Sequence, residues 1–142
     1  MELSALFHNK ILLSAALAWV AAQIIKAGLN AVRHHIFEWQ RIFGDGGMPS
    51  SHSATASAAA LACGLCAGFD SALFGLSVVL AFTVCHDAMH SRQEIGKQAE
   101  VLNELIRDEK RERDLEELVG HTPTQVAVGI AVGLLSALLI CL

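Results

Sequence analysis

Charged side chains are scarce in this sequence of 142 residues. Asp, Glu, Lys and Arg together make up 17% of it, against about 25% in soluble domains. Hydrophobic residues make up 54%, and the mean hydropathy is +0.48. The net charge is −4 and no basic stripe is present, so nucleic-acid binding is not indicated. One domain of this length with so little charge is typical of a membrane protein, provided that its apolar residues are clustered.

Four stretches contain no charged residue at all, and they are the candidate membrane-spanning helices. They cover residues 11–25, 53–69, 71–85 and 126–142. With their flanks they predict spans at about 10–29, 52–69, 71–89 and 124–142, near the short limit of about 17–25 residues for a spanning helix. A soluble bundle of buried helices is the alternative, but the segregation of charge between the runs favours the membrane. We therefore predict an all-α integral membrane bundle of four transmembrane helices, one domain over residues 1–142.

The short connection at residues 68–71 predicts an antiparallel hairpin, which fixes the topology. Loops 30–51 and 90–123 then lie on one side of the membrane, and both termini lie on the other. Nine of the ten Lys and Arg residues fall on the loop side, and only Lys10 falls on the terminal side. The positive-inside rule therefore predicts cytoplasmic loops in a cell or inner membrane, with both termini outside the cytoplasm.

Two further features of the chain bear on this topology. The first run has no signal-peptide cleavage site and is expected to be retained as a helix. Apolar residues at helical spacing, followed by dense charge of both signs, predict a cytoplasmic amphipathic and charged helix within residues 97–118, between the third and fourth spans.

Small residues are placed where helices could approach one another closely. Two pairs four residues apart have the small-xxx-small spacing of packed membrane helices: Gly64 with Gly68, and Gly129 with Gly133. The second run is rich in alanine and is expected to be central, and such faces could also support a homo-oligomer. All four cysteines lie in apolar runs. Cys63 and Cys66 form a C-x-x-C pair, but the other ligands of a structural zinc site are missing, so we interpret them as packing residues.

Three polar segments fall on the predicted cytoplasmic face. They are GGMPSSHS (46–53), HDAMHSR (86–92) and GHTPTQ (120–125). Serines 50, 51 and 53 after a proline, and Thr122 or Thr124 beside another, are suited to cap helices whose N-terminal amides attract anions. With two histidines and nearby cations, these segments indicate a phosphate site. They contain His52, His121 and Arg92, and Lys26 closes the first run on the same side.

Asp87 lies at the end of an apolar run. A carboxylate there costs free energy, so it normally has an interaction partner or a functional role. An alternative use of this segment is a metal site formed by His86, Asp87, His90 and His121. The segment supplies too few further ligands to name a metal, and our prediction includes no metal and no cofactor.

The motifs GGMPSSHSA, DA…R…GKQAEVLN and GHTPTQV resemble a divergent membrane family related to type 2 phosphatidic acid phosphatases and vanadium haloperoxidases. The resemblance runs from about Lys26 to Gly133. The wider superfamily has three motifs. The resemblance implies that Lys26 and Arg41, or Arg33 in place of Arg41, form the first motif. Residues 49–52 correspond to the second motif, P-S-G-H. Arg92 would begin the third motif, and the residue after it, Gln93, stands where the family usually has a second arginine. The phosphate-binding residues implied are Lys26, Arg41, Ser50, Ser51 and Arg92.

The resemblance also implies catalytic roles. His52 would protonate the leaving alkoxide. Gln98 stands where the third motif has its histidine, so His121 is the nearest candidate nucleophile. Gln125 stands where an acid is usual, which leaves Asp87 as the candidate to orient His121.

Two functions follow as expectations. The first is a metal-independent phosphatase that hydrolyses a membrane lipid phosphate or isoprenoid phosphate through a histidine nucleophile. The second is a non-catalytic membrane protein that binds an anionic lipid or polyprenyl phosphate in a transport or scaffold role. The distance between the His52 and His121 rings helps to distinguish the two functions, because catalysis requires both rings to reach one phosphate.

Overall fold

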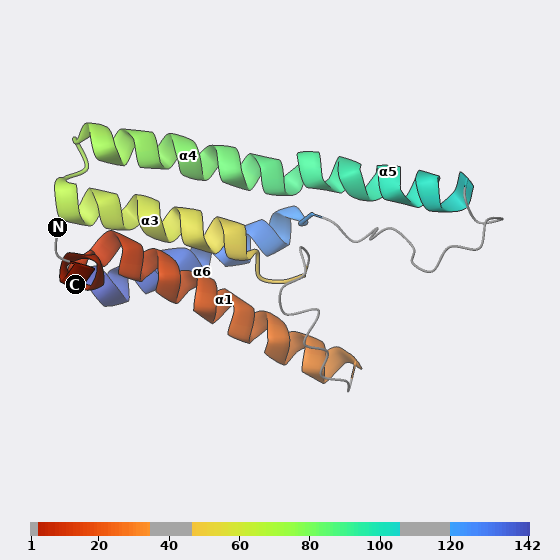
Figure 1. Ribbon diagram of the computed structural model, residues 1–142, viewed down its shortest axis with the longest axis horizontal. Coiled ribbons are helices and arrows are strands. Elements are labelled where there is room, and N and C mark those ends of the chain that lie inside the picture. The colour runs from red at the N-terminus through yellow and green to blue at the C-terminus, as the bar shows by residue number, and fades with distance from the viewer. Residues whose placement is uncertain (1–2, 35–46, 106–119) are drawn as a thin grey trace.

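The computed structural model describes residues 3–34, 47–105 and 120–142, and these segments form helices and no strands (Figure 1). A short 3-10 helix, η1 (Leu3–His8), precedes the α-helices. The α-helices are α1 (Lys10–His34), α3 (Ser51–Ala67), α4 (Ala72–Met89), α5 (Ser91–Leu105) and α6 (Pro123–Cys141). The predicted all-α class is confirmed.

The helix α3 lies at the centre of the bundle. It contacts α1, α4 and α6, and α1 also contacts α6. Its alanines form a fully buried cluster with alanines of α1 and α6: Ala18, Ala22, Ala54, Ala58, Ala62 and Ala137. The central place expected for the alanine-rich run is confirmed. The helix α3 runs opposite to both α1 and α4, α6 runs parallel to α3, and both termini lie at one end of the bundle (Figure 1).

The glycines of α6 explain how closely it approaches α3. A Cβ added at Gly129 would collide with the backbone oxygen of Ser50, and one at Gly133 would collide with Ala54 and Ser57. The predicted close approach is thus confirmed for this pair. Because Gly129 and Gly133 pack against α3 of the same chain, a homo-oligomer would have to form through other faces with small residues.

The other predicted glycine pair has a different role. Gly64 makes room for the rings of Phe69 and Phe74, which pack edge to face with centroids 5.1 Å apart. Gly68 is the C-cap of α3 with φ of 96°, a conformation that favours glycine, and its N–H donates to Gly64 O. The atoms nearest to this pair are therefore side chains of the α3–α4 turn and of α4, and not the backbone of a neighbouring helix.

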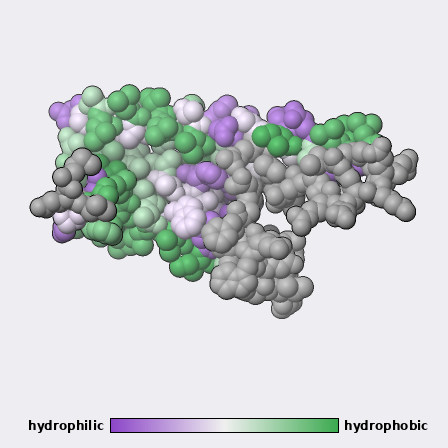
Figure 2. Space-filling view, viewed as in Figure 1, coloured by the Kyte–Doolittle hydropathy of each residue, from purple (hydrophilic) through white to green (hydrophobic). Residues whose placement is uncertain are grey.

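Three described helical segments are long and apolar enough to cross a membrane: Lys10–Val32, Ala72–Leu105 and Pro123–Cys141. Large apolar side chains cover their outer faces, and Figure 2 shows the hydrophobic surface over the part of the bundle that carries the termini. The helix α3 has 17 residues and is packed among the other three. A fourth span over α3 stays a prediction.

The predicted loops are partly helical. The helix α1 continues to His34, and α5 begins directly after α4, with only His90 between them, and extends in the same direction (Figure 1). The helix α5 covers residues 97–105 of the predicted amphipathic and charged segment. The remainder of that segment, and Arg41 in the first loop, lie outside the described residues.

Candidate functional site

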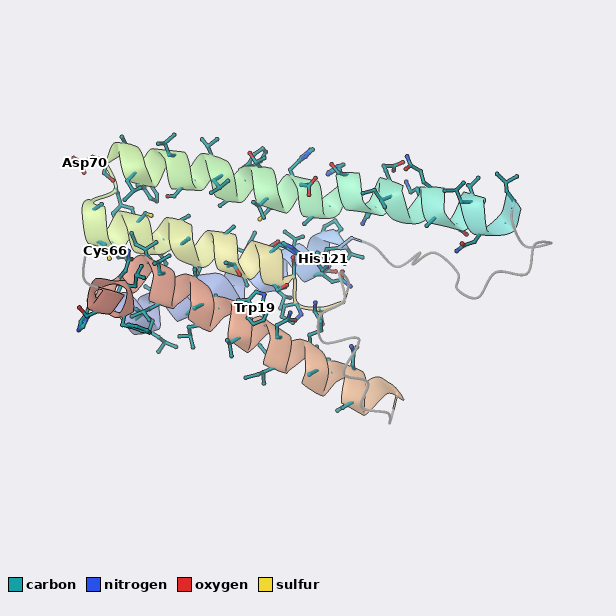
Figure 3. The ribbon with its side chains drawn as sticks, viewed as in Figure 1. Trp19, Cys66, Asp70 and His121 are labelled. Carbon is teal, nitrogen blue, oxygen red and sulfur yellow. The ribbon has the colours of Figure 1, made fainter. Side chains whose placement is uncertain are left out.

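The three polar segments meet at the end of the bundle where α3 and α6 begin. The N–H of Ser50 donates to Gln125 O at 3.1 Å, which joins the first segment to the third. The N–H of His121 donates to Ala88 O at 2.9 Å, which joins the third segment to the second. Figure 3 shows His121 at this end and Asp70, in the α3–α4 turn, at the other.

Ser50 is the N-cap of α3, a choice that the sequence left open among three serines. Its hydroxyl oxygen accepts from the Ser53 N–H at 3.3 Å and from the Ser53 hydroxyl at 3.0 Å. Ser50 is fully buried, and its own N–H is bonded to Gln125. A phosphate contact from Ser50 could therefore come only from its hydroxyl proton. Ser51 follows at the first helical position and is 6% exposed.

The N-terminus of α6 is closed by a capping box. The Thr122 hydroxyl accepts from the Gln125 N–H at 3.3 Å, and the Gln125 side-chain oxygen accepts from the Thr122 N–H at 3.0 Å. Pro123 has no N–H to offer. Two helix N-termini were predicted to bind the anion, but the Thr122 and Gln125 N–H groups of α6 are bonded within the capping box.

His52 and His121 face each other across this junction. Their ring centroids are 6.4 Å apart, with an angle of 52° between the ring planes. His121 is 2% exposed, and its Nδ1 atom is buried with no hydrogen-bond partner among the described residues. A buried polar atom without a partner costs about 1–3 kcal/mol, which a ligand bonded to it would offset.

The backbone of His121 is held on both sides by the α4–α5 junction. Its N–H donates to Ala88 O, and its carbonyl accepts from the side-chain nitrogen of Gln93 at 2.8 Å. The sequence alone does not indicate a role for Gln93. Its place directly after the motif arginine was the only signal available, because the contact spans 28 residues of chain.

Lys26 brings a positive charge from α1 to the same place. Its side chain is 2% exposed, and its Cγ would lie 3.7 Å from a Cβ added at Gly47. Burial lowers the pKa of His121 below its ordinary value of 6.5, and the charges of Lys26 and His52 lower it further. A hydrogen bond with the Gln125 side chain opposes this shift without cancelling it. His121 is therefore neutral at pH 7 and keeps a free electron pair on its ring.

The positions of Asp87 and Arg92 relative to the two histidines are less well defined. Asp87 lies on α4 with an exposed side chain, and its role in orienting His121 stays a prediction. Arg92 is the second residue of α5, and its side chain is not among those described.

The candidate metal ligands are not gathered together. His86 and His90 stack on each other with ring centroids 4.3 Å apart, and both are exposed. Within residues 3–34, 47–105 and 120–142, no group of three or more His, Cys, Asp or Glu side chains is arranged to hold a metal ion. The alternative metal site is therefore not supported by this geometry.

The order of these residues along the chain matches a known family. The model of the Divergent PAP2 family matches residues 7–136, nearly the whole chain. The chain belongs to this family. It is also 33% identical over 151 residues to the Uncharacterized membrane protein YuiD of Bacillus subtilis (strain 168), and the match covers 95% of this chain and 96% of the relative. A comparison with solved structures gave no match.

Membership of the Divergent PAP2 family agrees with the resemblance seen in the motifs. The described helices and the membrane relative indicate an integral membrane protein. In this member of the family, His52 at the start of α3 and His121 just before α6 are the residues around which the polar end is built.

Proposed function

We propose that this protein is a membrane-embedded phosphatase that hydrolyses a lipid phosphate monoester or an isoprenoid phosphate, with His121 as its nucleophile. The observation that carries the proposal is the 6.4 Å distance between the His52 and His121 rings, beside buried Lys26. This spacing is too long for the rings to bond directly and short enough for one phosphoryl group to reach both.

The charge state of His121 suits a nucleophile. Its lowered pKa keeps the imidazole neutral at pH 7, so a ring nitrogen can attack phosphorus and form a phosphohistidine while the bond to the alkoxide breaks. His52 would give a proton to the departing alkoxide and then take one from the water that hydrolyses the intermediate. Water attack releases inorganic phosphate and restores His121.

Positive charge and backbone amides would stabilise the phosphoryl oxygens. Lys26 lies close enough to lower the pKa of His121, so a phosphate bound there would meet the same charge. Ser51 stands at the N-terminus of α3, whose dipole favours an anion. Arg41 and Arg92 complete the proposed phosphate-binding set by the family motifs, and Asp87 stays in it as a proposed orienting residue.

A membrane-bound substrate fits the position of the site. We propose that the site faces the cytoplasm and that both termini lie outside, because the basic residues gather on the loop side. A site at helix ends in a membrane protein meets the headgroup layer, where a lipid phosphate is presented at the correct depth. Labelling of an introduced cysteine at the Asp70 turn with a membrane-impermeant maleimide would test the orientation.

A second function is favoured by one observation. The groups that hold His121 are the neutral amides of Gln93 and Gln125, which supply no negative charge to stabilise a positive ring. Such a site could bind an anionic lipid or polyprenyl phosphate without cleaving it. A bound lipid phosphate that is recovered intact after prolonged incubation would support this second function.

Phosphate release by the purified protein separates the two. Phosphatidic acid, phosphatidylglycerophosphate and an isoprenoid phosphate are incubated with wild type, His52→Ala and His121→Ala. His8→Ala is the matched control, because this exposed histidine lies at the opposite end of the bundle. We expect release by wild type and the control, and loss of at least 100-fold in the two site variants. Equal background release by all four proteins would rule out the phosphatase.

A further inference from the structure

Two thiols from different helices lie side by side at the end of the bundle opposite to His121. The Sγ atoms of Cys66 and Cys141 are 3.9 Å apart. Cys66 is exposed in the last turn of α3, and Cys141 is the half-buried last residue of α6. Figure 3 labels Cys66 and His121 near opposite ends of the bundle.

The neighbours of Cys141 fix its backbone against α1. The Lys10 side-chain nitrogen donates to Cys141 O at 3.1 Å, and the Ser14 hydroxyl lies 3.8 Å from Cys141 Sγ. Bonded sulfurs are about 2.05 Å apart, so the two thiols need to approach by about 2 Å, a distance within reach of side-chain rotation. The pair is thus held in place before any bond forms.

We propose that Cys66 and Cys141 are a disulfide-forming site that exchanges with small-molecule disulfides and links the ends of α3 and α6. The Cys66 thiolate attacks one sulfur of the reagent, which forms a mixed disulfide and releases one reagent thiolate. The Cys141 thiolate then attacks the Cys66 sulfur, forms the protein disulfide and releases the second thiolate. Two protein thiols are oxidised, one reagent disulfide is reduced, and the two thiol protons pass to the released thiolates.

Cys66 is the residue that reacts first because it is exposed. The other member of its C-x-x-C pair, Cys63, is 4% exposed and faces the interior. Cys141, and not the sequence neighbour Cys63, is thus the thiol that we pair with Cys66. In the orientation proposed above, the pair lies outside the cytoplasm, where disulfides persist. The exchange reaction itself does not depend on that orientation.

The bond would act on the helix pair that carries the candidate site. His52 begins α3 and His121 precedes α6, and the proposed bond joins the other ends of these two helices. It links residues 75 positions apart, a long loop whose closure restricts the unfolded chain. Oxidation is expected to raise the unfolding temperature and to limit separation of α3 from α6.

Oxidised glutathione is the probe that tests the proposal. The purified full-length protein is treated with it in detergent, and free thiols, proteolytic fragments and unfolding temperature are measured. We expect loss of two of the four free thiols, a fragment pair joined through Cys66 and Cys141, and a higher unfolding temperature that a reductant reverses. Cys85→Ser is the matched control, because Cys85 lies on α4, and it should behave as wild type.

Variants of the pair give the opposite result. Cys141→Ser should keep glutathione on Cys66 as a mixed disulfide, with no joined fragments and no reversible gain in unfolding temperature. Recovery of a Cys63–Cys66 bond, a covalent dimer, or only a glutathione adduct in the wild type would overturn the proposal.

Discussion

Replacing Gly129 by alanine would put a methyl group into the closest contact between α6 and α3. The new Cβ would lie 3.2 Å from the Cβ of Ser53 and 3.3 Å from the carbonyl carbon of Ser50, and it would overlap the oxygen of that carbonyl. The same oxygen accepts the Ala54 N–H at 3.0 Å in the first turn of α3. The substitution therefore acts on the helix start that carries His52.

The size of the effect follows from this contact. A carbon and a carbonyl oxygen normally stay about 3.3–3.6 Å apart, so α6 must move by about 1 Å. Overpacking of this kind costs about 1–3 kcal/mol, and the better helix propensity of alanine offsets up to about 1 kcal/mol. We expect Gly129→Ala to lower the stability by about 1–2 kcal/mol, which is about 3–8 °C in the unfolding temperature.

Gly75→Ala is the matched control, because a Cβ at this α4 position meets nothing within 4 Å. It gains only helix propensity and should be neutral or stabilising by up to about 1 kcal/mol. Thermal unfolding in the same detergent compares the two variants. If Gly129→Ala is as stable as Gly75→Ala, the close α3–α6 contact described here is wrong.

Three other predictions concern His121. Gln125→Glu keeps the capping box but adds a carboxylate, so an NMR titration should show the His121 pKa raised by about 1–3 units, and an unchanged pKa would contradict the contact. Gln93→Ala and Gln93→Glu both remove the donor to His121 O and should each lower stability by about 0.5–1.5 kcal/mol in thermal unfolding, whereas an effect confined to Ala would indicate lost packing. The pKa of His121 is lower in the folded protein, so the unfolded chain takes up this proton at a higher pH. The contribution of His121 to the free energy of unfolding should therefore be complete above pH 6.5 and be lost as the pH drops from there to the folded pKa. The substitution His121→Asn should abolish this pH dependence.

The sequence was sufficient to predict the helices and the end of the bundle at which the polar segments meet. Uncharged runs fix where buried or lipid-facing helices lie, and a four-residue connection permits only an antiparallel hairpin. The family could also be recognised, because nine consecutive residues of one motif are a specific signal.

Individual contacts at the site were not predictable in the same way. Ser50, Ser51 and Ser53 are equally able to cap a helix, and only the start of α3 decides among them. Gln93 and His121 are 28 residues apart, so their hydrogen bond depends on how α4 and α5 continue past the start of α6.

The same limit applies at the other end of the bundle. The C-x-x-C spacing shows only that Cys63 and Cys66 lie one helical turn apart, and we interpreted both as packing residues. Helix packing brings Cys141 to within 3.9 Å of Cys66. The spacing of Gly64 and Gly68 likewise predicted a close approach of two helix backbones. The atoms nearest to Gly64 are instead those of two aromatic rings, Phe69 and Phe74. Spacing identifies residues that share a helix face but does not say which neighbour covers that face.

Trapping of a phosphohistidine would show whether His121 is the nucleophile. The purified protein is incubated briefly with phosphatidic acid labelled in its phosphate group, quenched in alkali, and mapped by mass spectrometry. We expect label on His121 in the wild type and in His8→Ala, and none in His121→Ala. Phosphate release without label on His121, or label on another residue, would contradict it.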